Sequence, residues 1–302
     1  MGAIFALLSA TSWGISNALI RRAQNNTSYS INIGTFLTII INNVINICVL
    51  SIILILQGPI EITAIGVFFF AIGGLLNSCI GRSFLFRCFN RIGSARGGVI
   101  KGLMPIFVIL GGVIFLKEQM SHMMWAGVIV ILGGVYTISF DTLNKVSGLE
   151  NNKGEKMLLR EGIIIGIISC LFLASGNLMR KVGLQYINNS VLGVTIGSFV
   201  GLLAYGIYFL IKGDKKQIAL ALKTFNKDYL FGGIFTSAAL YLVFFSMQLI
   251  PISVTNSVAA SEPLFTIIMS YLLLKNNKEN ITYLTVIGGF LIIIGTVILM
   301  LF

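Results

Sequence analysis

Long apolar stretches separated by short polar ones dominate the chain from its first residues to its last. A helix needs about 20 apolar residues to cross the hydrocarbon core of a bilayer, and ten stretches approach that length. They are expected at residues 2–20, 31–56, 62–89, 99–116, 123–140, 162–179, 191–211, 229–249, 252–274 and 283–302. The pattern predicts an all-α integral membrane protein with ten transmembrane helices.

One longer polar stretch divides the ten spans into two sets of five. Residues 141–160 are rich in Asn, Gly, Ser and charged side chains, a composition typical of a connection. They are interpreted as an exposed linker between a first half, residues 1–140, and a second half, residues 161–302.

The two halves repeat the same side chains in the same order. A shift of 160 residues places Gly2, Ser9, Asn17 and Arg21 on Gly162, Ser169, Asn177 and Lys181, and a shift of 158 places Ile92, Pro105, Phe107, Leu116 and Lys117 on Ile250, Pro263, Phe265, Leu274 and Lys275. Because five spans is an odd number, the second copy enters the membrane upside down. The fold class is therefore two inverted five-helix repeats, an arrangement found in many secondary transporters.

Composition agrees with a membrane protein and changes how the charge is interpreted. Hydrophobic residues make up 56% of the 302 residues, charged ones only 10%, and the mean hydropathy is +0.95. The net charge of +11 comes mostly from short connections, so it indicates topology and lipid headgroup contacts rather than nucleic acid. The first apolar stretch has no basic segment before it and is expected to be an uncleaved span, in the plasma membrane or the bacterial inner membrane.

Several ordered motifs resemble the EamA-type members of the drug/metabolite transporter superfamily. These motifs are Trp13-Gly14 with Asn17, the run from Asn90 to Arg96 that leads to Pro105, Leu116-Lys117-Glu118 with Gly127 and Gly133, the run from Arg180 to Leu184, the run from Glu262 to Phe265, and Gly289 with Gly295. The resemblance covers nearly the whole chain. It implies a carrier of small metabolites, often an exporter, that works by alternating access around a central cavity.

The orientation of the termini is predicted in opposite ways by two arguments. Lys and Arg number fifteen in one set of connections and three in the other, where Lys117, Arg180 and Lys181 lie. The positive-inside rule then places both termini outside the cell. The family resemblance suggests both termini in the cytoplasm, and we favour the charge count.

Charged side chains inside the spans are the first candidates for function, because a charge in lipid is costly and usually faces a protein interior or a water-filled path. Arg82, Lys101 and Glu262 are such residues. If Arg82 and Lys101 face inward, the cavity is cationic and favours carboxylate or phosphate groups. Glu262 either carries a coupling proton or pairs with one of the cations. Arg87, near a span end, is expected to reach the headgroups.

Polar and proline residues at repeated positions complete the predicted substrate-binding set. Asn17 and Asn177 occupy equivalent places, with Trp13 one turn before Asn17, and the two amides either bind a ligand or join helices. Pro105 and Pro263 each remove a backbone donor within a span. These prolines mark either helix breaks at a central site or simple packing kinks.

No cofactor, metal or catalytic residue is expected. Four cysteines lie in apolar stretches without ligand spacing, His122 has no partner at ligand spacing, and the chain has no phosphate-binding GxxxxGK[ST] loop. Gly193, Gly197 and Gly201 form a tandem GxxxG motif, which indicates either close packing within one chain or a homodimer.

The sequence predicts a secondary-active transporter, not an enzyme. The expected cargo is a small polar metabolite bearing a carboxylate or another anionic group, such as an amino acid, moved outward by proton coupling or exchange. The predicted site is lined by the first, third, fourth, sixth, eighth and ninth spans. A membrane scaffold or sensor subunit and, less favoured, an intramembrane enzyme are the alternatives.

Overall fold

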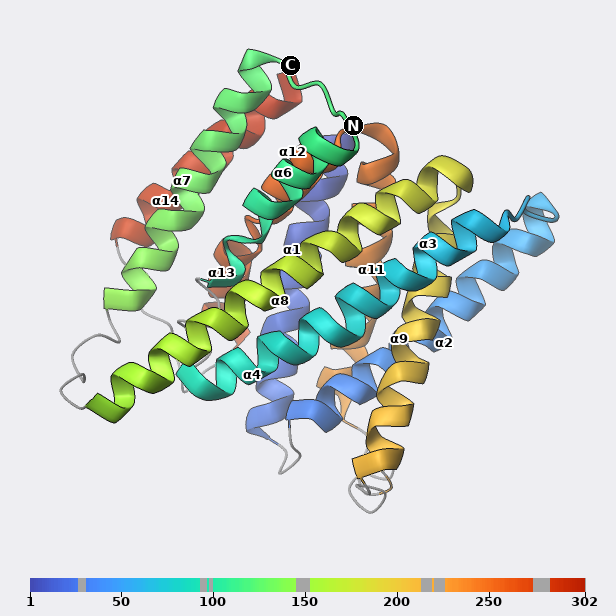
Figure 1. The fold of residues 1–302 in the computed structure, drawn as a ribbon, viewed down its shortest axis with the longest axis horizontal. Coiled ribbons are helices and arrows are strands. Elements are labelled where there is room, and N and C mark those ends of the chain that lie inside the picture. The colour runs from blue at the N-terminus through green and yellow to red at the C-terminus, as the bar shows by residue number, and fades with distance from the viewer. Residues whose placement is uncertain are drawn as a thin grey trace.

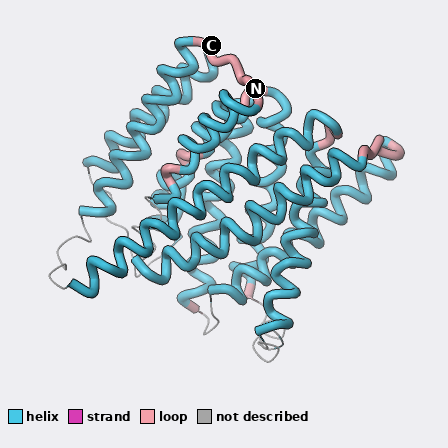
Figure 2. The backbone as a smooth tube through the Cα atoms, in the orientation of Figure 1, coloured by secondary structure: helices cyan, strands magenta, loops and turns pink. Residues whose placement is uncertain are grey.

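A computed structural model describes residues 1–26, 31–92, 97, 100–144, 153–212, 219, 226–273 and 283–301. Within these residues all regular structure is helical (Figures 1 and 2). Three predicted features lie wholly or partly outside them, because residues 93–96, 145–152 and 274–282 are not described. They are the end of the second motif, the middle of the linker, and Lys275 with its neighbours.

The helices form ten spans, as the apolar pattern predicts. The first half contains α1 (Gly2–Asn25), α2 (Ile31–Gln57), α3 (Ala64–Gly74), the π-helical η1 (Leu75–Gly81), α4 (Arg82–Ile92), α6 (Met104–Phe115) and α7 (His122–Asn144). The second contains α8 (Lys153–Tyr186), α9 (Ser190–Lys212), α11 (Lys227–Leu249), α12 (Ile252–Ala259), α13 (Glu262–Leu273) and α14 (Tyr283–Leu301). The third span consists of α3, η1 and α4, and the ninth of α12 and α13.

The length and composition of the helices fit a membrane. Seven described stretches are long and apolar enough to cross one, and three shorter apolar helices, Met104–Phe115, His122–Thr137 and Val286–Leu299, complete the ten. Large apolar side chains such as Ile55, Phe115 and Ile211 are exposed, as expected where lipid replaces water. The chain is a multi-pass membrane protein.

The polar stretch between the halves is more helical than the sequence predicts. α7 continues to Asn144 and α8 already begins at Lys153, so both ends of the 141–160 stretch belong to helices. The physical reason for the early start of α8 is local, because Lys, Glu, Met, Leu and Arg between residues 153 and 160 are good helix formers.

The two halves pack on each other in a reciprocal way. α1 packs against α11 and α13, whereas its repeat counterpart α8 packs against α3, η1 and α4. The counterparts α2 and α9 contact each other, as do α7 and α14. α1 and α8 run in opposite directions, and both termini lie at one end of the molecule (Figure 1). The arrangement is that of an inverted repeat.

The tandem GxxxG motif packs within the chain. On α9, Gly193 faces Phe70, Gly197 faces Gly74, and Gly201 faces Ser78. The glycines thereby bring the seventh span close against the third.

Candidate functional site

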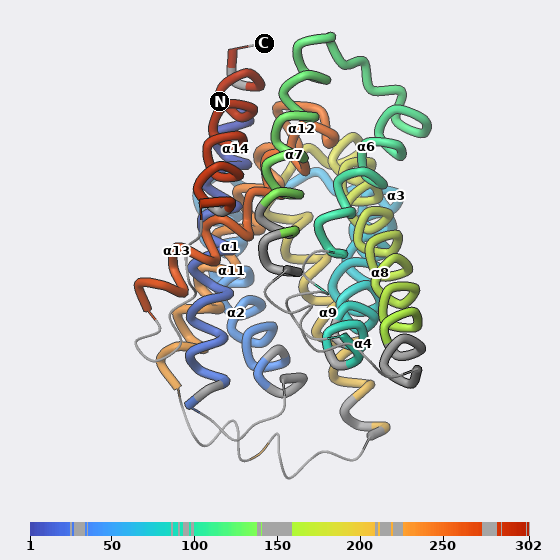
Figure 3. The backbone as a smooth tube through the Cα atoms, turned by 90° about the vertical axis from the view of Figure 1, so that its left-hand side faces the viewer, coloured from blue at the N-terminus to red at the C-terminus, as the bar shows by residue number. Residues whose placement is uncertain are grey.

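The fourth and ninth spans are both interrupted at the predicted prolines. α6 begins at Met104 with Pro105 in its first turn, and α13 begins at Glu262 with Pro263 in its first turn. Proline is well tolerated there, because the first turn of a helix has no intrahelical use for its N–H groups. The two prolines therefore mark breaks at matching places in the two repeats rather than kinks within continuous helices. Figure 3 shows the second break between α12 and α13.

Next to these breaks, Asn17, Lys101 and Glu262 form a group that we call the ion-pair cluster. Lys101 Nζ lies 2.9 Å from Glu262 Oε1 and 3.1 Å from Oε2, and Asn17 Nδ2 donates to Oε1 at 2.7 Å. The side chains of Lys101 and Glu262 are 35% and 18% exposed. The carboxylate of the second half is thus engaged by two donors of the first half, and its charge is matched by that of Lys101.

Gly14 allows α1 to come close enough to α13 for Asn17 to join this cluster. A Cβ atom at Gly14 would lie 2.5 Å from the Cβ of Phe265 and 2.7 Å from its backbone carbon, so only glycine allows α1 to approach α13 this closely. The close approach brings Asn17, one turn further along α1, within hydrogen-bonding distance of Glu262.

A second polar group joins the third, sixth and ninth spans. Asn77 Nδ2 donates to Asn177 Oδ1 at 3.0 Å, and Asn177 Nδ2 donates to Asn256 Oδ1 at 2.8 Å. Arg180 lies one turn further along α8 and donates to Asn177 Oδ1 at 3.4 Å and to Ser78 Oγ at 3.3 Å. We call Asn77, Ser78, Arg82, Asn177 and Arg180 the guanidinium cluster.

Arg180 is the least compensated charge in this cluster. The residue is 5% exposed, its Nε has no hydrogen-bond partner, and its guanidinium carbon lies 5.6 Å from the ring centre of Phe244. Among the described residues no carboxylate lies within ion-pair distance of it, and the nearby charge that acts on it is the like charge of Arg82. A buried cation without an acid is costly, which suggests a functional reason for its presence.

The π-helical segment η1 positions Asn77 and Ser78. Single π-helical turns inside α-helices are rare and frequently occur at functional sites. Gly74, directly before η1, packs on α9 so closely that an added Cβ would lie 2.4 Å from the carbonyl oxygen of Gly197. The tight contact fixes the third span against the seventh next to the two polar side chains.

A small cavity of about 30 Å³ adjoins the guanidinium cluster. It is lined by Thr38, Ile39, Asn42, Asn77, Ser78, Arg82, Ser198, Thr236 and Leu240. The Arg82 guanidinium also lies 6.0 Å from the ring centre of Trp13, at the outer limit of a cation–π contact. The cavity has room for a water molecule but not for a metabolite.

Side chains also hold together the end of the molecule that carries the termini. Glu118 accepts hydrogen bonds from the backbone N–H groups of Ile252 and Ser253, at the start of α12. Lys181 Nζ donates to the carbonyl oxygens of Met247 and Ile250, where α11 leads into α12. A carboxylate at a helix N-terminus and an ammonium at a helix C-terminus are both favourable placements.

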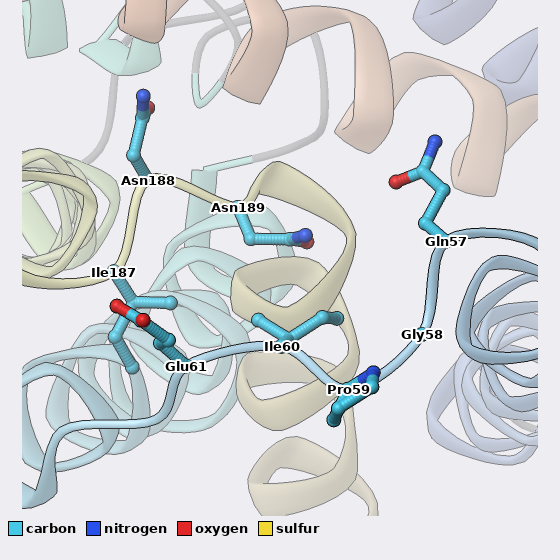
Figure 4. Close-up of a pocket in the computed structure, with 8 residues that line it drawn as sticks. All are labelled: Gln57, Gly58, Pro59, Ile60, Glu61, Ile187, Asn188 and Asn189. Atoms are coloured by element: carbon cyan, nitrogen blue, oxygen red, sulfur yellow. The ribbon is translucent and has the colours of Figure 1, made fainter.

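A separate depression lies between two connections on the surface. It has a volume of about 250 Å³ and is lined by residues 57–61 and 187–189 (Figure 4). Glu61 is its one charged lining residue. Nothing about these side chains indicates a binding chemistry, and we do not assign the depression a function.

The structure distributes the predicted site residues over both clusters. Asn17, Lys101 and Glu262 lie in the first cluster, Arg82 and Asn177 lie in the second, and Trp13 contacts Arg82. Lys101 pairs with Glu262 and does not line the cavity. Arg87 is exposed on α4, with its guanidinium 5.5 Å from the ring centre of Phe84, as expected for an arginine that reaches the headgroups.

Sequence reasoning missed Arg180 because it ended the sixth span at residue 179. α8 continues to Tyr186 and buries Arg180, so neither Arg180 nor Lys181 belongs to a connection. The cavity is lined by the second, third, seventh and eighth spans, of which the prediction included only the third and eighth. The run of Asn42, Asn43 and Asn46 in the apolar second span was the available signal.

Comparisons with known proteins agree with this geometry. The sequence profile of the EamA-like transporter family matches residues 1–140 and 160–301. A similar solved structure, described only as the crystal structure of a protein, has a TM-score of 0.69 and 14% sequence identity. The match covers 98% of this chain and 96% of that one, and at this identity it shows the fold alone. No curated protein matches significantly.

Proposed function

Because the chain belongs to the EamA-like transporter family, it transports a small molecule across a membrane, and we propose that this cargo carries a carboxylate or another anionic group. The observation that supports the proposal is the guanidinium cluster. Arg82 lines the cavity, and Arg180 lies one layer behind it, hydrogen-bonded to Ser78. Two guanidiniums without an acid among the described residues favour an anion, which arginine can bind through two parallel hydrogen bonds.

Transport requires the cavity to open alternately toward the two sides. At the end that carries the termini, Glu118 joins the α6–α7 connection to α12, and deeper in the molecule α1, α13 and Lys101 meet in the ion-pair cluster. Both groups join elements of the two halves, so rocking one half against the other would separate one group while the other stays intact. We propose this alternating access, directed outward, as the transport cycle.

The ion-pair cluster bears on how transport is driven. Glu262 is the acid that a coupling proton would use, but its oxygens already accept hydrogen bonds from Lys101 and Asn17. This engagement supports exchange of one anion for another over proton coupling. Exchange predicts uptake that depends on anion inside the vesicles and not on a pH gradient.

The decisive experiment is uptake of a radiolabelled anion panel into vesicles containing the purified protein, with Arg82→Gln and Arg87→Gln as matched variants. Both arginines lie on α4, but only Arg82 lines the cavity. A hydrogen bond to a charged group contributes about 1.5–3 kcal/mol, so we expect Arg82→Gln to reduce anion transport by roughly 10- to 100-fold. Arg87→Gln should transport normally. Equal transport by both variants, or transport of cations only, would contradict the proposal.

A further inference from the structure

The polar groups around the cavity are hydroxyls, amides and one guanidinium, without a carboxylate, and Ile39 and Leu240 add apolar surface. Thr38, Ser78, Ser198 and Thr236 supply hydroxyl groups, Asn42 and Asn77 supply amides, and Arg82 supplies the charge. All of these lining residues belong to the described part of the chain. Several of these groups already bond to protein partners, Asn42 to Ser237, Thr236 to Ser16 and Asn77 to Asn177. Because hydroxyls and amides both donate and accept hydrogen bonds, their remaining capacity suits a ligand with an anionic end and several neutral polar groups.

An ammonium group finds no counter-charge there. A buried cation without a paired acid is costly, and the like charges of Arg82 and Arg180 would add repulsion. Glu262 is a carboxylate in the described spans that could pair with an ammonium group. Its two oxygens, however, already lie within 3.1 Å of Lys101 Nζ. A zwitterionic amino acid would therefore place its ammonium among groups that stabilise the opposite charge.

From this lining we infer that the cargo is a small hydroxylated carboxylate, a hydroxy acid, rather than an amino acid. The inference rests on the proposed function and narrows its substrate class. The carboxylate of such a cargo binds at Arg82 and Ser78, with Arg180 supporting the site from behind. Its hydroxyl groups exchange hydrogen bonds with the amides and hydroxyls of the second, seventh and eighth spans.

Two pairs of nearly isosteric compounds test the inference directly. Glycerate differs from serine, and malate from aspartate, only in a hydroxyl group where the amino acid has an ammonium. Dissociation constants of all four are measured on the purified full-length protein in detergent, by calorimetry and by ligand-dependent thermal stabilisation. We expect the hydroxy acid of at least one pair to bind at least 10-fold more tightly than its amino acid.

The variants separate this inference from the proposed function. Hydroxy acid binding should be lost in Arg82→Gln and kept in Arg87→Gln. If an amino acid binds as tightly as its hydroxy acid and needs Arg82, the proposed anionic cargo stands and the hydroxy acid inference is wrong. If no hydroxy acid binds, the inference is also wrong. Binding of neutral or cationic compounds alone would overturn the proposed function as well.

A gain-of-function variant provides a second test of the inferred preference for hydroxy acids. Asn42→Asp keeps the side-chain shape and adds a carboxylate to the lining. The ratio of amino acid affinity to hydroxy acid affinity should rise at least 10-fold in this variant for the pair that binds. An unchanged ratio would contradict the claim that a missing counter-charge sets the preference.

Discussion

Both polar clusters contain buried charges, but within the described residues the charges are paired in one cluster and unpaired in the other. In the ion-pair cluster Lys101 faces Glu262, and Asn17 completes the hydrogen bonding. In the guanidinium cluster Arg180 is more deeply buried, yet it has only amide and hydroxyl partners among the described residues. The first arrangement holds two halves together, whereas the second leaves unmatched positive charge next to a cavity. The difference separates a structural contact from the anion-binding site that we propose.

Pseudo-symmetry makes the contrast informative. Asn17 and Asn177 occupy equivalent positions in the two repeats, but Asn17 donates to a carboxylate and Asn177 joins a chain of amides. At the shift of 158 residues that aligns Pro105 with Pro263, Met104 stands where the second repeat has Glu262. Of these two matching positions in the repeats, only the one in the second half carries an acid. That acid pairs with Lys101, and the guanidinium cluster stays cationic.

The largest effect on stability is expected from breaking the ion pair. Lys101→Met leaves Glu262 with only the Asn17 amide. Removing one partner of a fully buried pair costs about 3–5 kcal/mol, and the partial exposure of Lys101 reduces this to about 2 kcal/mol. The free energy of unfolding in mixed micelles measures the loss.

The matched control for this variant is Lys101→Met combined with Glu262→Met, which removes both charges. The double variant should be more stable than the sum of the two single changes predicts, by about 1 kcal/mol or more. Additive changes would show that the pair does not interact energetically.

An intermediate effect is expected at the contact between the third and seventh spans. Gly74→Ala places a methyl group against the Gly197 backbone. Such overpacking typically costs about 1–3 kcal/mol, and the higher helix propensity of alanine offsets about 1 kcal/mol of this, so we expect a net loss of about 1 kcal/mol. Because η1 follows directly, anion binding should weaken as well, while the coupling between Lys101 and Glu262 stays unchanged. The unfolding free energy and the anion dissociation constant measure both parts. Gly133→Ala, where an added Cβ meets no atom within 4 Å, is the control. It should leave the anion dissociation constant unchanged and raise the unfolding free energy by up to about 1 kcal/mol through helix propensity.

The smallest effect on stability is expected at Arg180, despite its deep burial. Replacing buried charged groups by apolar residues of similar size is often neutral or stabilising, so Arg180→Met should change the unfolding free energy by less than about 1 kcal/mol in the unfavourable direction. Anion binding should nevertheless be lost. A variant that is strongly destabilised and still binds anions would show that Arg180 serves the fold and not the site.

Much of the architecture could be predicted from sequence because it depends on local properties. Apolar length identified the ten spans, odd span number with repeated motifs indicated inversion, and Pro105 and Pro263 indicated where two spans are interrupted. The pairing of Glu262 was recognised as an alternative, since one acid and several cations lay at similar depth. Its partner could not be chosen, because that choice depends on how α1, α13 and the residues before α6 meet in space.

Sequence alone determined that this chain spans a membrane ten times and has two related halves, because hydropathy and internal repetition are properties of residue order. Tertiary structure decided which charges are matched. Arg180 became a buried group because α8 extends beyond its apolar core, and Ser78, which lies in the π-helical η1, accepts a hydrogen bond from it. Whether a charge is paired depends on distances of a few ångströms between helices far apart in the chain, and those distances are set by packing at positions such as Gly14 and Gly74.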